Sequence, residues 1–247
     1  MPIKQHEAVI QTMERLGGLA TLGQLYQEAL KDPNCEWKTK TPFASIRRIV
    51  QLRPEIYKIK PGLYGLNAFQ NQNEARGILA ETQENKNSLE LLTSNHYYYQ
   101  GLLLTLGNLR RFKTFAPNQD KNKRFLDKKL DDLRSLKKIP FFSYPELVKR
   151  SETIDVIWFN KRRMPHSFFE VESSTDIQNS LAKYIDLQDF CVRMFIVADK
   201  RRQVEYGTKI GRSPFEEIKL RVKLLDFESL VKQYEYAMGY EKLEVVI

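Results

Sequence analysis

Two neighbouring apolar segments that carry carboxylates constrain the fold of this chain more than any other feature. Residues 153–159 (Thr-Ile-Asp-Val-Ile-Trp-Phe) and residues 167–173 (Ser-Phe-Phe-Glu-Val-Glu-Ser) are rich in β-branched and aromatic residues, and a basic turn separates them. This pattern predicts a β-hairpin. Glu170 and Glu172 are two positions apart, so both project from the same face of the expected strand. Asp155 lies within the first segment, and the hairpin brings it beside that pair.

Three carboxylates gathered in one small area repel one another, and burial removes the water that would otherwise solvate them. A bound divalent cation resolves this repulsion, and an all-oxygen ligand set suits Mg²⁺ or Mn²⁺. One or two such ions can activate water for attack on a phosphodiester and neutralise the charge that develops on the phosphate. The alternative is that the carboxylates lie unbound on an exposed sheet face.

The segments around the hairpin alternate between helical and extended patterns. The expected elements are a buried helix ending near residue 106, a strand at 112–117, a polar helix at 128–135, a helix at 174–189 with Thr175 as its N-cap, and a buried strand at 191–198. This order predicts an α/β or α+β domain with a central mixed sheet flanked by helices.

The first 66 residues have a different pattern. Helices are expected at 3–16, ending at two glycines, at about 22–30, and from Pro42 to Leu52, followed by strands at 56–60 and 63–66 around a Pro-Gly turn. This order resembles the winged helix-turn-helix, which some restriction enzymes and chromatin proteins carry. The resemblance implies that the third helix enters a major groove. A module that binds protein or dimerises is the other reading.

The net charge of +9 is concentrated in two places. Residues 109–138, called here the basic segment, hold eleven Lys or Arg against four Asp, and residues 1–66 hold ten against six Asp or Glu. A localised basic surface favours binding to a polyanion, although a solvated helix face would have the same composition. The expected DNA contacts are Lys40, Arg47, Arg48, Arg53, Lys58, Lys60, Lys121, Lys123 and Arg124.

Residues 154–159 (Ile-Asp-Val-Ile-Trp-Phe) and 169–175 (Phe-Glu-Val-Glu-Ser-Ser-Thr) together resemble the core of the PD-(D/E)XK nucleases, the restriction-endonuclease-like fold. The resemblance implies that Asp155 and Glu170 are metal ligands. The third position of that pattern is usually lysine, whereas this chain has Glu172. Whether Glu172 acts as a base, as an extra ligand or through a bound water stays open.

Two further residues are candidate auxiliary groups. The family often has a Glu on the helix before the hairpin, where this chain has Gln100, either a weak ligand or an amide satisfied within the core. Lys183, on the helix after the hairpin, either supplies the missing cation or is a solvated helix lysine.

The expected organisation is a winged helix-turn-helix domain at 1–68, a linker rich in Asn, Gln and Glu at 69–92, and a nuclease domain at 93–247. Cys35 and Cys191 are expected to be reduced thiols, because no export signal or apolar span is evident. We therefore expect a prokaryotic cytoplasmic protein with no membrane partner. A glycine-rich phosphate loop is missing from the sequence, so no nucleotide cofactor is expected.

These patterns predict a metal-dependent, sequence-specific endonuclease of the type II restriction kind that hydrolyses double-stranded DNA, with Mg²⁺ or Mn²⁺ as cofactor. A homodimer is expected, because each active site cuts one strand. The alternatives are a catalytically inactive DNA-binding regulator, a repair or transposon-linked nuclease of the same fold, and a nuclease of structured RNA.

Overall fold

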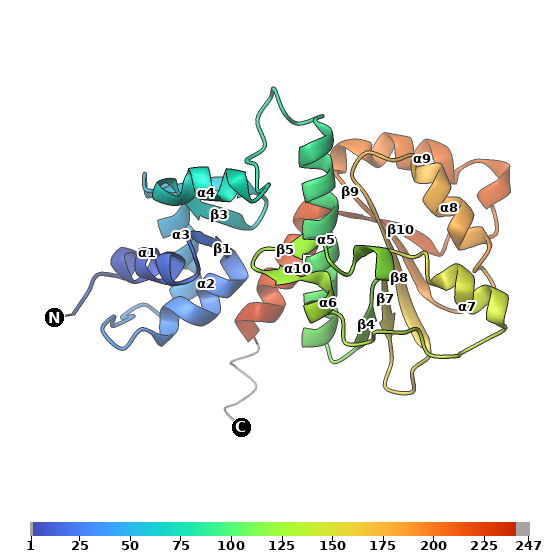
Figure 1. The fold of residues 1–247 in the computed structure, drawn as a ribbon, viewed down its shortest axis with the longest axis horizontal. Coiled ribbons are helices and arrows are strands. Elements are labelled where there is room, and N and C mark those ends of the chain that lie inside the picture. The colour runs from blue at the N-terminus through green and yellow to red at the C-terminus, as the bar shows by residue number, and fades with distance from the viewer. Residues whose placement is uncertain (1, 241–247) are drawn as a thin grey trace. The chain divides into compact units, whose positions relative to one another are not determined.

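The structure, a computed structural model, describes residues 2–240 (Figure 1). Residues 2–94 and 231–240 form one compact unit, and residues 95–230 form another. The N-terminal unit and the C-terminal unit are the names used for them below. Helices α5 (Leu89–Leu109) and α10 (Phe227–Tyr240) each contribute residues to both units.

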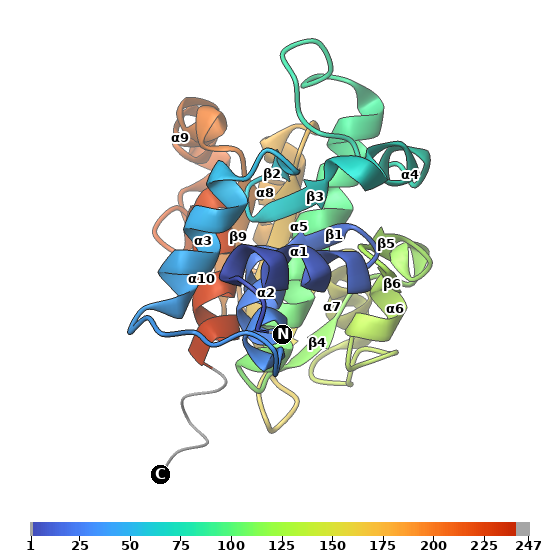
Figure 2. The same ribbon diagram turned by 90° about the vertical axis from the view of Figure 1, so that its left-hand side faces the viewer.

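The N-terminal unit places helices next to a small antiparallel sheet (Figure 2). Its described elements are α1 (Gln5–Arg15), β1 (Leu19–Thr21), α2 (Leu22–Glu28), η1 (Ala29–Lys31), α3 (Pro42–Leu52), β2 (Ile56–Lys60), β3 (Leu63–Leu66), η2 (Asn67–Phe69) and α4 (Gln70–Ala75). The sheet order is β1-β3-β2. The expected helices and the β2–β3 turn are confirmed, whereas β1 was not predicted. Only three residues long, β1 is too short for a periodic pattern.

Local sequence explains where these elements begin and end. Gly17 and Gly18 have φ of 80° and 78°, a left-handed conformation that terminates α1 at little cost because glycine lacks a Cβ. The hydroxyl of Thr21 accepts from the backbone N–H of Gln24 (3.1 Å), which caps α2. Pro42 occupies the first turn of α3, where its missing N–H leaves no bond unmade.

The end of α10 packs into the N-terminal unit (Figure 2). The hydroxyl of Tyr234 lies 3.2 Å from that of Thr21. Arg47 of α3 pairs with Glu235, with 3.1 Å between Nη2 and Oε2. This charged pair and this hydroxyl contact hold the end of α10 against residues 2–94 of the same unit.

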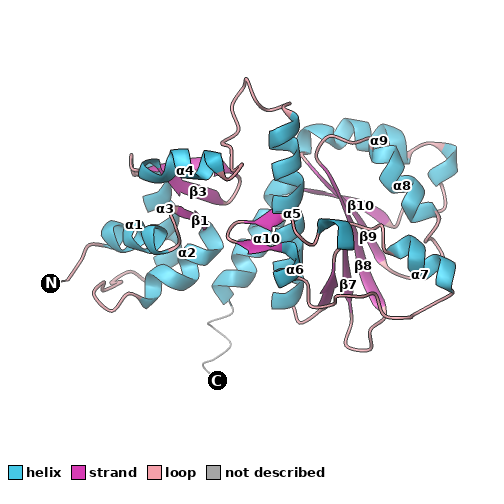
Figure 3. Cartoon of the chain, viewed as in Figure 1, coloured by secondary structure: helices cyan, strands magenta, loops and turns pink. Residues whose placement is uncertain are grey.

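The C-terminal unit is built on a mixed sheet of the described strands β10-β9-β8-β7-β4 (Figure 3). The strands are β4 (Lys113–Phe115), β7 (Val156–Phe159), β8 (Pro165–Glu172), β9 (Arg193–Ala198) and β10 (Val222–Asp226). β4, β7 and β8 are antiparallel neighbours, whereas β9 is parallel to both β8 and β10. The predicted mixed sheet flanked by helices and the predicted β7–β8 hairpin are therefore confirmed.

Helices lie on both faces of this sheet (Figure 3). The remaining described elements of the unit are η3 (Asn118–Asp120), β5 (Arg124–Phe125), β6 (Lys128–Lys129), α6 (Leu130–Leu133), α7 (Pro145–Ser151), α8 (Ile177–Ile185), η4 (Lys200–Arg202), α9 (Gln203–Ile210) and η5 (Ser213–Phe215). On one face, Phe168 and Met194 pack with Leu181 of α8. On the other, the indole N–H of Trp158 donates to the Leu103 carbonyl of α5 (3.0 Å).

Three local predictions were wrong. Where a polar helix was expected at 128–135, the chain has strand β6, which pairs with β5, and then the single helical turn α6, because this Lys- and Asp-rich stretch has too few apolar residues to bury a longer helix. Asp176, not Thr175, caps α8, and its carboxylate accepts from the N–H of Gln178 (2.8 Å). Asp155 lies immediately before β7 and not inside it, so its side chain is at the end of the strand.

Candidate active site

Strand β8 holds two buried carboxylates against helix α8. Glu170 and Glu172 are 2% and 3% exposed, and both face the hydroxyl of Ser180. Ser180 Oγ lies 3.0 Å from Glu170 Oε2 and also contacts Glu172 Oε1, while Thr175 donates to Glu172 Oε2. Because alternate residues of a strand share a face, the expected placement of the two side chains on one side of the sheet is confirmed.

Asp155 joins this pair from the neighbouring strand end. The N–H of Val171 donates to Asp155 Oδ2 (2.7 Å), which fixes the carboxylate beside β8. Burial raises the pKa of Asp155 to about 7. Burial and then the charge of Asp155 raise the pKa of Glu170 to about 8. The two carboxylates therefore resist being ionised together unless a positive charge lies near them.

Lys183 supplies one positive charge. Its Nζ donates to Glu170 Oε2 (2.7 Å) and to the carbonyl of Thr153 (3.0 Å). Burial by itself would lower the pKa of Lys183, but the carboxylates of Glu170 and Asp155 outweigh it and raise that pKa. The ammonium therefore stays charged beside Glu170, and the structure brings this sequence candidate into the carboxylate cluster.

Helix α5 faces Asp155 with two polar side chains one turn apart. Gln100 is fully buried, and its Nε2 donates to Asp120 Oδ2 (3.1 Å) and to the Asp155 carbonyl (2.8 Å). His96 Nε2 lies 3.8 Å from Asp155 Oδ1, and its Nδ1 lies 2.9 Å from the Val171 carbonyl. Gln100 is thus near the site, as expected, but its amide N–H groups bind Asp120 and the backbone.

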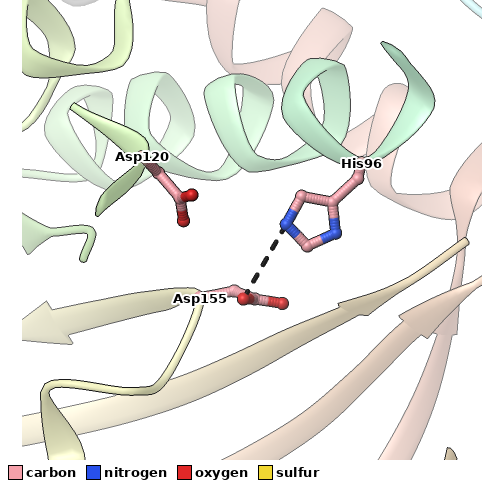
Figure 4. Close-up of side chains that lie close together, drawn as sticks. All are labelled: His96, Asp120 and Asp155. Atoms are coloured by element: carbon pink, nitrogen blue, oxygen red, sulfur yellow. Dashed lines mark ion pairs between the residues drawn. The ribbon is translucent and has the colours of Figure 1, made fainter. Parts of the chain in front are cut away.

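His96 and Asp120 were not among the residues selected from the sequence. Potential ligand atoms of His96, Asp120 and Asp155 all lie within 4.8 Å of one another (Figure 4). Their sequence separations are 24 and 35 positions, and no ligand spacing marks them. The spacing of His96 and Gln100, four apart on one helix, was the available signal that they share a face.

Two buried oxygen atoms in this cluster have no hydrogen-bond partner in the part of the chain that the structure describes. They are Glu170 Oε1 and Gln100 Oε1. Buried acceptors are nearly always satisfied in folded proteins, so each needs a donor or a cation. Carboxylate and amide oxygens with one imidazole are suitable ligands for a divalent metal. The residues present therefore fit the expected cation.

The exposed cations of the basic segment adjoin this cluster. Asp120 ends η3, and Lys121, Lys123 and Arg124 follow it at the start of the β5–β6 hairpin. Lys123 Nζ lies 5.1 Å from the ring centre of Tyr97, the residue after His96. The loop that presents these three cations therefore also carries Asp120, whose carboxylate lies close to His96 and Asp155.

The basic residues of the N-terminal unit that were expected to contact DNA differ in exposure and in ion pairing. Lys60 is 3% exposed, burial lowers its pKa to about 8, and its Nζ donates to Ser94 Oγ (3.3 Å). A buried ammonium does not reach phosphates, so we do not retain Lys60 as a DNA contact. Arg47 is exposed but paired with Glu235. Of the other candidates, Arg53 is half-buried and the exposed ones are Lys40, Arg48 and Lys58.

None of the described helices combines the length and apolar character needed to cross a membrane. The family model for the type II restriction enzyme NmeDI C-terminal domain matches residues 78–246. Comparisons with curated proteins and with solved structures found no match. The matched range contains every residue of the carboxylate cluster and the whole basic segment.

Proposed function

The chain belongs to the family of the type II restriction enzyme NmeDI C-terminal domain, and from this membership we propose that it is a metal-dependent endonuclease that cleaves double-stranded DNA. The family makes it a restriction-endonuclease-like protein. The observation that supports the metal dependence is the cluster of the half-buried Asp155 with the buried Glu170 and Glu172, in which one oxygen of Glu170 has no partner among the described residues. The PD-(D/E)XK pattern of these residues supports the same proposal.

Asp155 and Glu170 hold the divalent cation, Mg²⁺ or Mn²⁺. When bound, the cation lowers the pKa of coordinated water and neutralises the negative charge that develops on the phosphate. Lys183 takes the place of the lysine usual at the third position of the pattern, because its Nζ is 2.7 Å from Glu170 Oε2. Its ammonium would hold a positive charge beside the proposed metal ligand Glu170.

Glu172 acts as a positioning residue. Its Oε1 contacts Ser180 and its Oε2 accepts from Thr175, so both oxygens already have partners within the chain. Glu170, in contrast, keeps one oxygen without a partner among the described residues. This difference favours Glu170 over Glu172 as the ligand and gives Glu172 the task of orienting the start of α8.

The N-terminal unit binds DNA as a winged helix, with α3 in the major groove. The order of helices followed by the β2–β3 turn supports this assignment, as does the exposure of Arg48 and Lys58. Recognition of a specific sequence and dimerisation, which would let two active sites cut both strands, belong to the same proposal. Replacing both Arg48 and Lys58 with Ala should weaken DNA binding in a mobility-shift assay. Replacing Lys31, which pairs with Glu28, should not.

A cleavage assay tests the proposed function. Plasmid DNA is incubated with wild type, Asp155→Asn or Glu170→Gln in Mg²⁺ and in EDTA, with exposed Glu152→Gln as the matched control. We expect cleavage by wild type and the control in Mg²⁺ only, and none by the two site variants, which still fold by circular dichroism and bind DNA. A wild type that binds DNA but does not cleave it in either Mg²⁺ or Mn²⁺ would be a DNA-binding regulator, and cleavage that persists in EDTA would refute the metal dependence.

A further inference from the structure

His96, Asp120 and Asp155 converge from three separate elements of the C-terminal unit (Figure 4). His96 lies on α5, Asp120 ends η3, and Asp155 precedes β7. All three are buried or half-buried, with Asp120 only 7% exposed. Two carboxylates this close repel each other, and the hydrogen bonds of the nearby Lys183 ammonium go to Glu170 and to the Thr153 carbonyl.

The hydrogen bond of His96 determines which ring nitrogen is free. Nδ1 lies 2.9 Å from the carbonyl oxygen of Val171, and a carbonyl can only accept, so Nδ1 carries the proton. In the neutral ring, Nε2 then directs a lone pair toward Asp155 Oδ1 at 3.8 Å. This distance is too long for a hydrogen bond, and a shared cation could bridge it. Metal-binding histidines commonly donate their other ring N–H to a carbonyl in this way.

Gln100 is the second observation that points to a ligand. Its side chain is fully buried and its Nε2 binds both Asp120 Oδ2 and the Asp155 carbonyl, so the amide lies within the cluster. Its Oε1 has no partner in the described part of the chain. A cation at this point would supply the missing partner, which a simple His96–Asp155 ion pair would not.

We propose that His96, Asp120 and Asp155 form a mixed nitrogen–oxygen site for a transition-metal dication such as Mn²⁺, with Gln100 Oε1 at its edge. An imidazole ligand favours Mn²⁺ and later first-row metals over Mg²⁺ and Ca²⁺. This site does not include Glu170, but it shares Asp155 with the Asp155–Glu170 cation site proposed above. Asp120 also begins the loop of Lys121 and Lys123, which would bring a phosphate next to the cation.

The site deepens the proposed function and rests on it for the phosphate substrate, but cation binding is measured without DNA. Full-length protein is titrated with Mn²⁺, and free ion is counted by electron paramagnetic resonance. Pulsed measurements then detect nitrogen bound to the ion. We expect a nitrogen modulation in wild type that changes when histidine is labelled with ¹⁵N.

Variants identify the nitrogen. His96→Gln should remove the modulation, whereas His166→Gln should keep it, because His166 contacts Ser167 and Phe112. Asp120→Asn should weaken Mn²⁺ binding by about 10-fold or more. Circular dichroism confirms that each variant folds, and the labelled wild type shows by itself whether a histidine binds the ion.

Wild type that binds Mn²⁺ without nitrogen modulation, or that binds no Mn²⁺, overturns the inference. Cleavage in Mg²⁺ with no such modulation would leave the proposed nuclease intact and the imidazole site refuted. Modulation from His96 in a protein that cleaves nothing would leave the metal site intact and the nuclease refuted. The two failures are therefore distinguishable.

Discussion

Neutralising Glu170 should stabilise the protein when no divalent cation is present. The carboxyl is 2% exposed and one of its oxygens has no partner in the described structure. Burial and the charge of Asp155 raise its pKa from 4.5 to about 8. At roughly 1.4 kcal/mol per pKa unit, ionising it above pH 8 opposes folding by up to about 5 kcal/mol. Glu170→Gln removes that charge but also removes the partner of Lys183, so we expect a net gain of about 1–3 kcal/mol at pH 8.

The direction of the pH dependence follows from the same shift. Between pH 4.5 and about 8 the folded carboxyl keeps a proton that the unfolded one has lost. Unfolding then releases a proton, so the free energy of unfolding falls as pH rises through this window. Below pH 4.5 the contribution of this group is fully present, and above pH 8 its loss is complete. Glu170→Gln should flatten this part of the profile.

Urea denaturation in EDTA, at pH 5.5 and pH 8, measures both effects. Exposed Glu152→Gln is the matched control and should leave the wild-type profile unchanged. Added Mn²⁺ should stabilise wild type more than Glu170→Gln, because a ligand stabilises the state that binds it. A Glu170→Gln protein that is less stable than wild type at pH 8 in EDTA would refute the reasoning.

Three other predictions concern catalysis, the core and DNA binding. Lys183→Gln should slow single-turnover cleavage much more than Lys183→Arg, since Arg keeps the charge beside Glu170; equal rates would remove Lys183 from the mechanism. Phe168→Ala should lower the free energy of unfolding by about 3–5 kcal/mol, because the side chain is fully buried, and a loss below about 1 kcal/mol would contradict the core assignment. Reversing the charges of Lys121, Lys123 and Arg124 should reduce the salt dependence of DNA binding, and an unchanged slope would show that they do not contact phosphates.

Much of the local structure could be predicted because it depends on neighbouring residues. The alternation in residues 167–173 places Glu170 and Glu172 on one face, and the Pro-Gly turn after residue 60 joins β2 to β3. Glycines terminate α1 where only a left-handed residue fits. The hairpin within the basic segment and the true cap of α8 were missed, because short polar stretches carry no hydrophobic period and several residues there are suitable caps.

The C-terminal residues illustrate what local patterns leave undetermined. Residues 231–240 follow the nuclease-like sheet in the chain, yet they pack with residues 2–94. Val231 contacts the turn at Gly62, where a Cβ would meet its side chain at 2.4 Å. The helical pattern of residues 231–240 predicts an apolar face, but it does not predict which part of the protein will cover that face.

The candidate site likewise has features that the sequence determined and features that only the tertiary structure decided. The sequence alone determined that Glu170 and Glu172 share a strand face and that Asp155 belongs to the adjoining segment, because a strand repeats every two residues. Only the tertiary structure decided that Lys183 reaches Glu170, that Glu172 is occupied by hydroxyls, and that His96 and Asp120 join Asp155. These contacts link elements far apart in the chain, and packing of the helices against the two faces of the sheet sets them.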